Sequence, residues 1–150
     1  MSRSGYSDDG PEGIEETQRA NCYIGAVRSA LLGKRGQALL REMRAALDAM
    51  PVKTLVSDEL IRPSGEVCAL GAVGVHRDLP GLDSLDEEEH EDVARAFNVA
   101  EALVREIAYE NDEMAPQDPA GRWTYMRQWV EEQIVKEPRG PAPEGAEGTR

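Results

Sequence analysis

Apolar residues recur at helical spacing along most of the chain, and this pattern predicts a mostly α-helical protein. In the segment 14–32 the apolar positions at steps of three or four residues are Ala20, Ile24, Val27 and Leu31. The segment 37–50 repeats the pattern and stops before Pro51, which cannot continue a helix. We therefore expect two helices that are joined by the glycine-containing turn 33–36 and packed as an antiparallel pair.

The segment 65–76 is an apolar run of small residues without a polar face. A helix of this kind must be covered on every side, so we expect the other helices to pack around a buried helix 67–76. Ser64 stands where an N-cap is expected. The preceding segment 54–61 is β-branched and aliphatic but short, and it predicts either an extended stretch or one short β-hairpin.

Helix-start signals organise the second half of the chain. Ser84 begins a Ser-Leu-Asp-Glu sequence with the spacing of a capping box. The region 86–109 follows, either as one helix or as two that are divided at Asn98. Asp118 and Pro119 give an N-cap and a first-position proline for the last helix.

These elements add up to one compact domain. The fold class expected is a mostly α bundle of about five to six helices over residues 14–137. The segments 1–13 and 138–150 are rich in glycine, proline or acidic residues, and we expect them to be disordered tails.

Charge and composition narrow the classes of function. The 150 residues include 17 basic and 29 acidic residues, for a formal net charge of −12 at pH 7. Such a charge opposes direct nucleic-acid binding and membrane association, and it suits a basic partner. No run approaches the ~18 apolar residues of a membrane span, and the N-terminus lacks the apolar core of a signal peptide. Two cysteines make no disulfide framework or zinc site, so we expect a cytoplasmic protein without a cofactor or metal.

Two motifs carry a resemblance to known proteins. Residues 65–73 read Gly-Glu-Val-Cys-Ala-Leu-Gly-Ala-Val, and residues 109–112 read Tyr-Glu-Asn-Asp. The chain from 26 to 135, including the turn 33–37, resembles small uncharacterised proteins of phage and actinobacterial genomes that carry a Cys-Ala-Leu-Gly-Ala helix and a downstream Asn-Asp. The resemblance implies a small helical domain and carries over no activity. Glu110 departs from the form in which the aromatic residue directly precedes Asn-Asp.

Cys68 is the clearest candidate for catalysis. A thiol in the first turn of a helix lies near the positive end of the helix dipole, which favours the thiolate. The thiolate also needs a base, but His76 lies roughly 12 Å further along the same helix, and His90 would have to fold back from the acidic segment. We expect a buried packing residue and keep a Cys68-dependent enzyme, with His90 as its base, as the alternative.

Other charged motifs have both a structural and a functional interpretation. Lys34 and Arg35 lie between glycines and suit a phosphate, but the Walker A spacing is missing and a helix-connecting turn explains them. The acidic segment 87–92 has metal-ligand residue types but one imidazole only, so we expect a solvated face and no metal. Within it, Glu88, Glu89 and Glu91 are the candidates for binding a basic partner.

Two further features concern Asn111, Asp112 and the last helix. Asn-Asp after a long helix predicts a turn or cap, or else a tie to the helix of Cys68. Tyr125 and Trp129 share one face of the last helix, where an exposed pair would anchor a partner and a buried tryptophan would belong to the core.

Together these features favour a non-enzymatic, acidic phage-type protein that binds a basic host protein in the host cytoplasm, in an accessory or anti-defence role. Homodimer formation stays open. The alternatives are the Cys68-dependent enzyme and a DNA-mimicking inhibitor whose carboxylates stand in for phosphates.

Overall fold

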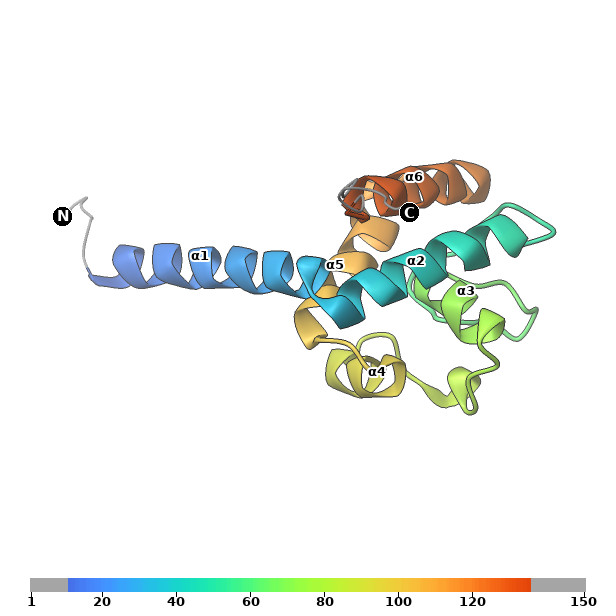
Figure 1. Cartoon of the computed structure of the whole chain (residues 1–150), viewed down its shortest axis with the longest axis horizontal. Coiled ribbons are helices and arrows are strands. Elements are labelled where there is room, and N and C mark those ends of the chain that lie inside the picture. Colours follow the sequence, from blue (N-terminus) through green and yellow to red (C-terminus); the bar gives the residue numbers. More distant parts are fainter. Residues whose placement is uncertain (1–10, 136–150) are drawn as a thin grey trace, which may run out of the picture.

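The computed structural model describes residues 11–135, with side chains from residue 21 onward. Its six α-helices are α1 (Pro11–Leu32), α2 (Lys34–Ala49), α3 (Ala69–His76), α4 (His90–Phe97), α5 (Glu101–Tyr109) and α6 (Pro119–Gln133) (Figure 1). A 3-10 turn, η1 (Leu82–Ser84), precedes α4, and a π-helical turn, η2 (Glu110–Met114), follows α5. The prediction of a mostly α bundle of five to six helices is confirmed.

The described residues contain no strand. The hairpin predicted at 54–61 is wrong, because the one bridge there is an isolated antiparallel pairing of Ile61 with Val67. The predicted tails lie outside the described residues except for 11–13, which form the first turn of α1. Within the described part, no helix is both long and apolar enough to cross a membrane.

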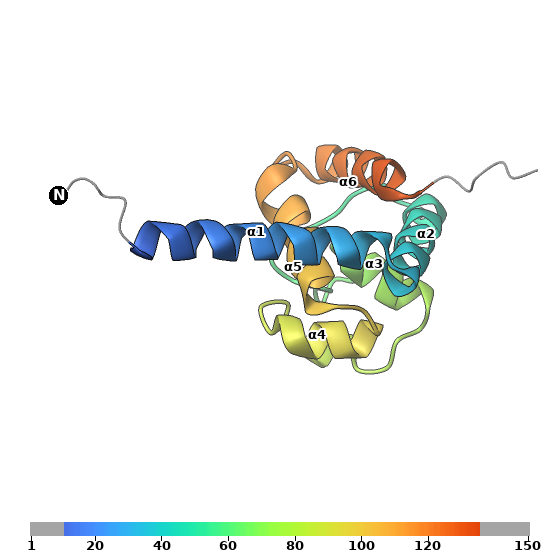
Figure 2. The ribbon, with the colours of Figure 1, turned by 60° about the vertical axis from the view of Figure 1, so that its left-hand side comes forward.

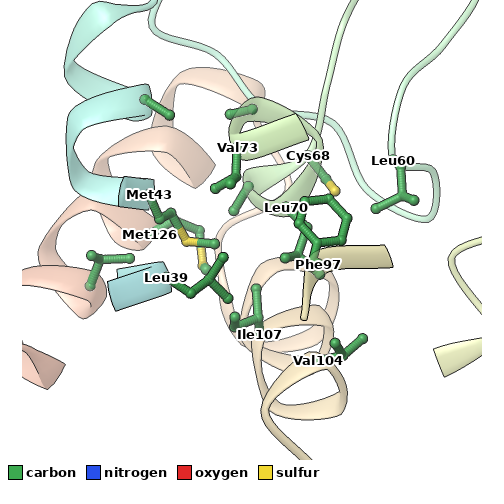
Figure 3. Close-up of a cluster of buried hydrophobic side chains, with 14 of the residues drawn as sticks. Leu39, Met43, Leu60, Cys68, Leu70, Val73, Phe97, Val104, Ile107 and Met126 are labelled. Carbon is green, nitrogen blue, oxygen red and sulfur yellow. The ribbon is translucent and has the colours of Figure 1, made fainter. Parts of the chain in front are cut away.

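The small-residue helix α3 lies at the centre of the fold. It contacts α2, α5 and η1, and its residues 69–74 are buried, although Val75 and His76 at its end are exposed. Figure 3 shows Cys68 and Leu70 beside Phe97 from α4. The other helices supply the rest of this core, including Leu39, Leu40, Met43, Leu47, Val93, Leu103, Val104, Ile107, Met126 and Val130.

Gly71 and Gly74 let neighbouring segments approach α3 closely. A Cβ at Gly71 would lie 1.8 Å from the carbonyl oxygen of Leu60, and a Cβ at Gly74 would lie 2.7 Å from Leu82 Cδ1. The N–H of Cys68 donates to the same Leu60 carbonyl at 3.2 Å. The loop before α3 is therefore in direct backbone contact with the helix.

The N-cap of α3 is Cys68, and the prediction of Ser64 is wrong. The Cys68 sulfur accepts from the N–H of Gly71 at 3.4 Å, whereas the Ser64 hydroxyl donates to Glu66 at 2.9 Å. Gly65 has φ 97° and turns the chain, after which Val67 pairs with Ile61 in the bridge. This bridge keeps the backbone extended up to Cys68 and delays the start of the helix.

The predicted antiparallel pairing of the first two helices is also wrong. Gly33 alone separates α1 from α2, and in Figure 1 the chain runs on from one helix into the next without folding back. Gln37 lies near this junction, and its amide nitrogen donates to the carbonyl oxygens of Leu31 at 2.7 Å and Gln133 at 3.0 Å. The N-terminal half of α1 extends clear of the other helices in both views (Figures 1 and 2).

Of the later helix-start signals, Asp118 holds and Ser84 is wrong, while Asn98 divides two helices by ending α4 and not by capping α5, whose N-cap is Ala100. The capping box at Ser84 does not form, because Ser84 ends η1 and α4 begins only at His90. Asn98 divides the region 86–109 into two helices, which is one of the two predicted forms. It ends α4 in the left-handed conformation, with φ 60°. Asp118 caps α6 by accepting from the N–H of Gly121 at 2.7 Å, with Pro119 in the first turn.

The contact at Gly71 gives a direct test of the packing. Gly71→Ala should lower the free energy of unfolding by about 3 kcal/mol or more, because the added methyl group overlaps a backbone carbonyl that cannot move freely. Gly25→Ala in α1 is the matched control, because a Cβ there meets nothing within 4 Å. It should leave stability unchanged or raise it by up to about 1 kcal/mol. Urea denaturation measures both, and equal stability of the two variants would contradict the packing at α3.

Candidate functional site

The candidate site is built around the side-chain amide of Asn111, which is 1% exposed. Its oxygen accepts from the N–H of Ala69 at 3.2 Å, at the start of α3. Its nitrogen donates to the carbonyl oxygen of Val56 at 3.0 Å and to the carboxylate of Asp112 at 2.7 Å. Of the two roles predicted for Asn111, the structure shows the tie to the helix of Cys68.

The π-helical turn η2 and Arg122 hold Asn111 in place. In this turn the N–H of Ala115 donates to the carbonyl oxygen of Glu110 at 2.9 Å, and turns of this width are frequent at functional sites. Arg122 is 3% exposed and donates to the carbonyl oxygens of Asn111 at 2.9 Å and Leu55 at 3.3 Å. The guanidinium thereby joins α6 to η2 and to the loop before α3.

Three carboxylates gather beside this network. Oxygen atoms of Asp58, Glu87 and Asp112 all lie within 4.8 Å of one another. The backbone N–H of Asp58, which has φ 69°, donates to Asp112 Oδ1 at 3.2 Å, and the Ser57 hydroxyl donates to Asp58 Oδ2 at 3.2 Å. Among the ion pairs found in the described residues, none includes any of these three acids. We call Asp58, Glu87 and Asp112 the acid cluster.

Glu87 is the buried member of the acid cluster. It is 7% exposed, so the prediction that it lies on a solvated face is wrong, whereas Glu88, Glu89 and Glu91 are exposed. Burial raises the pKa of Glu87 to about 8, with further contributions from the hydrogen bond and charge of Asp112. Its carboxyl group is therefore poised to hold a proton near neutral pH.

Cys68 lies next to the acid cluster, and its surroundings disfavour the thiolate that a cysteine nucleophile needs. It is 2% exposed, and burial, followed by the negative charge of Glu87, raises the pKa of its thiol to about 12. His76 is exposed at the end of α3 and His90 is half-buried at the start of α4. Within residues 21–135 no hydrogen bond joins either histidine to Cys68. These surroundings keep the thiol protonated.

The candidate phosphate ligands lie away from the acid cluster. Lys34 and Arg35 are exposed in the first turn of α2 and line a hollow of 520 Å³ together with Ala100 at the start of α5. Arg35 donates to the side-chain oxygen of Asn98 at 3.2 Å, across the gap between α2 and the end of α4. One of the two cations thus already has a partner within the fold.

Of the two interpretations of the last helix, core packing of a tryptophan holds and the exposed pair of Tyr125 and Trp129 does not form. Trp129 is 8% exposed and packs in the core beside Met126 and Val130. Tyr125 is half-buried, and its hydroxyl donates to Glu110 at 2.7 Å, a bond that raises the pKa of Tyr125 to about 12. These two side chains therefore offer no joint docking surface.

Thiol reactivity tests the environment of Cys68. Cys22 is exposed on α1 and Cys68 is buried, so a mild thiol reagent at neutral pH should label one equivalent quickly in the native protein and two in denaturant. Cys22→Ser should remove the fast phase and Cys68→Ser should leave it. Fast labelling of native Cys22→Ser would instead reveal a reactive Cys68.

The raised pKa of Glu87 predicts how the free energy of unfolding depends on pH. The buffer contains a chelator, so that only proton binding is measured. The group titrates near 4.5 when unfolded and near 8 when folded, so between these values the folded state binds more protons. The free energy of unfolding therefore falls as pH rises through this window. Urea denaturation across pH 4.5–8.5 should show a shallower fall in Glu87→Gln than in Glu88→Gln, and parallel curves would contradict the burial of Glu87.

The chain matches no protein-family model, no curated protein and no solved structure. The resemblance to phage proteins thus stays a prediction from the residues that carry it. Function has to be inferred from exposed surfaces and from the acid cluster.

Proposed function

We propose that the protein is a non-catalytic, phage-type module that acts by binding a basic host protein, and that α1 is the helix that docks. The observation that carries this proposal is the exposure of large apolar side chains on α1. Ile24 is 57% exposed, Leu32 is 56% exposed and Tyr23 is 44% exposed. Exposed apolar residues that cluster on one element mark interaction sites more often than scattered ones do.

The length of α1 and its few contacts with other helices support this role. At 22 residues, α1 is roughly 33 Å long, and it contacts α5 and α2. Its N-terminal half extends past them (Figure 2). A helix in water owes most of its stability to the packing of an apolar face, so a partner that covers Tyr23, Ile24 and Leu32 would stabilise α1.

A hollow beside α1 suits an apolar anchor from the partner. Its volume is 320 Å³, and it is lined by Ile24, Val27, Arg28, Leu31, Leu32 and Gln133. Four of these six side chains are aliphatic, whereas Arg28 and Gln133 are polar. Interfaces of this composition place one inserted apolar side chain inside a polar rim.

Charge selects the kind of partner. With a formal net charge of −12, two copies of this chain repel each other, whereas a basic protein is attracted. The exposed Glu88, Glu89 and Glu91 add a dense local negative charge that raises the association rate of a basic partner. A heterologous basic partner is therefore favoured over a homodimer.

The alternative functions receive less support. A Cys68-dependent enzyme needs a thiolate, which the burial of Cys68 opposes. A DNA mimic needs a band of unpaired carboxylates, but on α2 and α6 Asp48 binds Arg127 at 2.7 Å and Glu131 binds Arg44 at 3.2 Å. These pairs neutralise acidic positions that such a band would use.

A charge placed on α1 should abolish binding. Ile24→Asp puts a carboxylate among the apolar contacts, and we expect it to reduce capture of the partner from host lysate at least about tenfold. Ala45→Asp, at an exposed position of α2, adds the same charge to another helix and should bind like the unchanged protein. Quantitative mass spectrometry of the captured proteins measures both variants.

The contact itself is checked by photo-crosslinking from position 24 and from position 45, and by light scattering. The proposal requires a crosslink from position 24 to a basic protein, with an association rate that falls as salt increases. Equal capture by both variants would refute docking through α1. A dimer that Ile24→Asp converts to a monomer would show that the occupant is a second copy.

A further inference from the structure

We propose that Asp58, Glu87 and Asp112 bind one hard divalent cation, with Ca²⁺ the best fit. This site lies apart from α1 and does not depend on the function proposed above. It draws one ligand from the loop before α3, one from the segment between η1 and α4, and one from the π-helical turn η2.

The spacing of the oxygen atoms suits a single ion. Two oxygens bound to the same Ca²⁺ lie at most about 5 Å apart, because each Ca²⁺–oxygen distance is about 2.3–2.6 Å. The acid cluster meets this limit, since one oxygen from each of its three carboxylates lies within 4.8 Å of the other two. Mg²⁺ demands near-ideal octahedral geometry, whereas the flexible coordination of Ca²⁺ suits three ligands that come from separate segments. Carboxylate oxygens alone select hard cations over zinc or copper.

The burial of Glu87 is independent evidence for a bound ligand. It is 93% buried, and no N–H or O–H group within residues 21–135 forms a hydrogen bond to it other than through the carboxyl group of Asp112. Glu87 thus has no donor from outside the acid cluster in the described residues, and a cation between the three acids satisfies all of them at once.

The neighbouring bonds leave ligand atoms available. Asp112 Oδ1 accepts from the N–H of Asp58 and from the amide of Asn111, so these two donors orient the carboxylate and neither of them uses Oδ2. Asp58 is exposed and Asp112 is half-buried, which opens the cluster to solvent on one side. An ion can enter from that side and keep water molecules as its remaining ligands.

Calorimetry and thermal denaturation of the full chain test the site, with CaCl₂ and MgCl₂ as probes and NaCl at matched ionic strength as the reference. We expect CaCl₂ at about 100 times its dissociation constant to raise Tm by roughly 5 °C beyond the NaCl effect. Glu87→Gln should weaken Ca²⁺ binding at least about tenfold. Glu88→Gln, which removes an equal charge at the adjacent exposed position, should bind like the unchanged protein.

Asp58→Asn is the second variant, since an exposed residue can change without disturbing the core. It too should lose Ca²⁺ affinity while circular dichroism shows the same helical content. Equal Ca²⁺ responses of Glu87→Gln and Glu88→Gln would overturn the proposal in favour of general charge screening. A Tm that CaCl₂ raises no more than NaCl does would also overturn it, and would leave a proton shared by Glu87 and Asp112 as the stabilising group.

Discussion

The hydrogen bonds of the Asn111 amide are the constraint on which the rest of this structure depends. One buried side chain satisfies the first N–H of α3 and the carbonyl oxygen of Val56, which have no partner from regular secondary structure. Leaving such groups unpaired in the interior would cost about 1–3 kcal/mol each. Because Asn111 lies in η2, the position of the central helix is tied to that of the π-helical turn, and Asp112 next to it is brought to the acid cluster.

Small residues make this network possible. The loop before α3 runs close enough to the helix for the Leu60 carbonyl to accept from Cys68, and only a glycine at 71 leaves room for it. The same loop then reaches α6, where the N–H of Leu55 donates to the carbonyl oxygen of Pro119 at 3.1 Å. Close backbone approach replaces the β-hairpin that the β-branched residues of this segment had suggested.

The sequence predicted features that depend on neighbouring residues and missed those that depend on distant ones. Asp118 caps α6 as predicted because its partner, the N–H of Gly121, is three residues away. Glu87 has the spacing of a capping box, yet its carboxyl group faces Asp112, which no local pattern connects to it. The acid cluster could not be predicted for the same reason: its members come from three segments that only the folded chain brings together. For Asn111, the pattern allowed both a turn and a tie to α3, and packing decided between them.

The acid cluster differs from the other buried polar side chains of the described residues in how its burial is compensated. Elsewhere in the described residues the buried polar side chains Gln37, Asn111 and Arg122 donate to backbone carbonyl oxygens, so their burial carries little net cost. Glu87 faces two other acids in a chain that already carries a formal charge of −12, and this arrangement must be neutralised by a proton or by a cation. Local violations of this kind are typical of functional positions, because stability alone would favour an uncharged residue. The burial of Glu87 is therefore compensated by a proton or a cation within the acid cluster, and not by a donor from the other described residues.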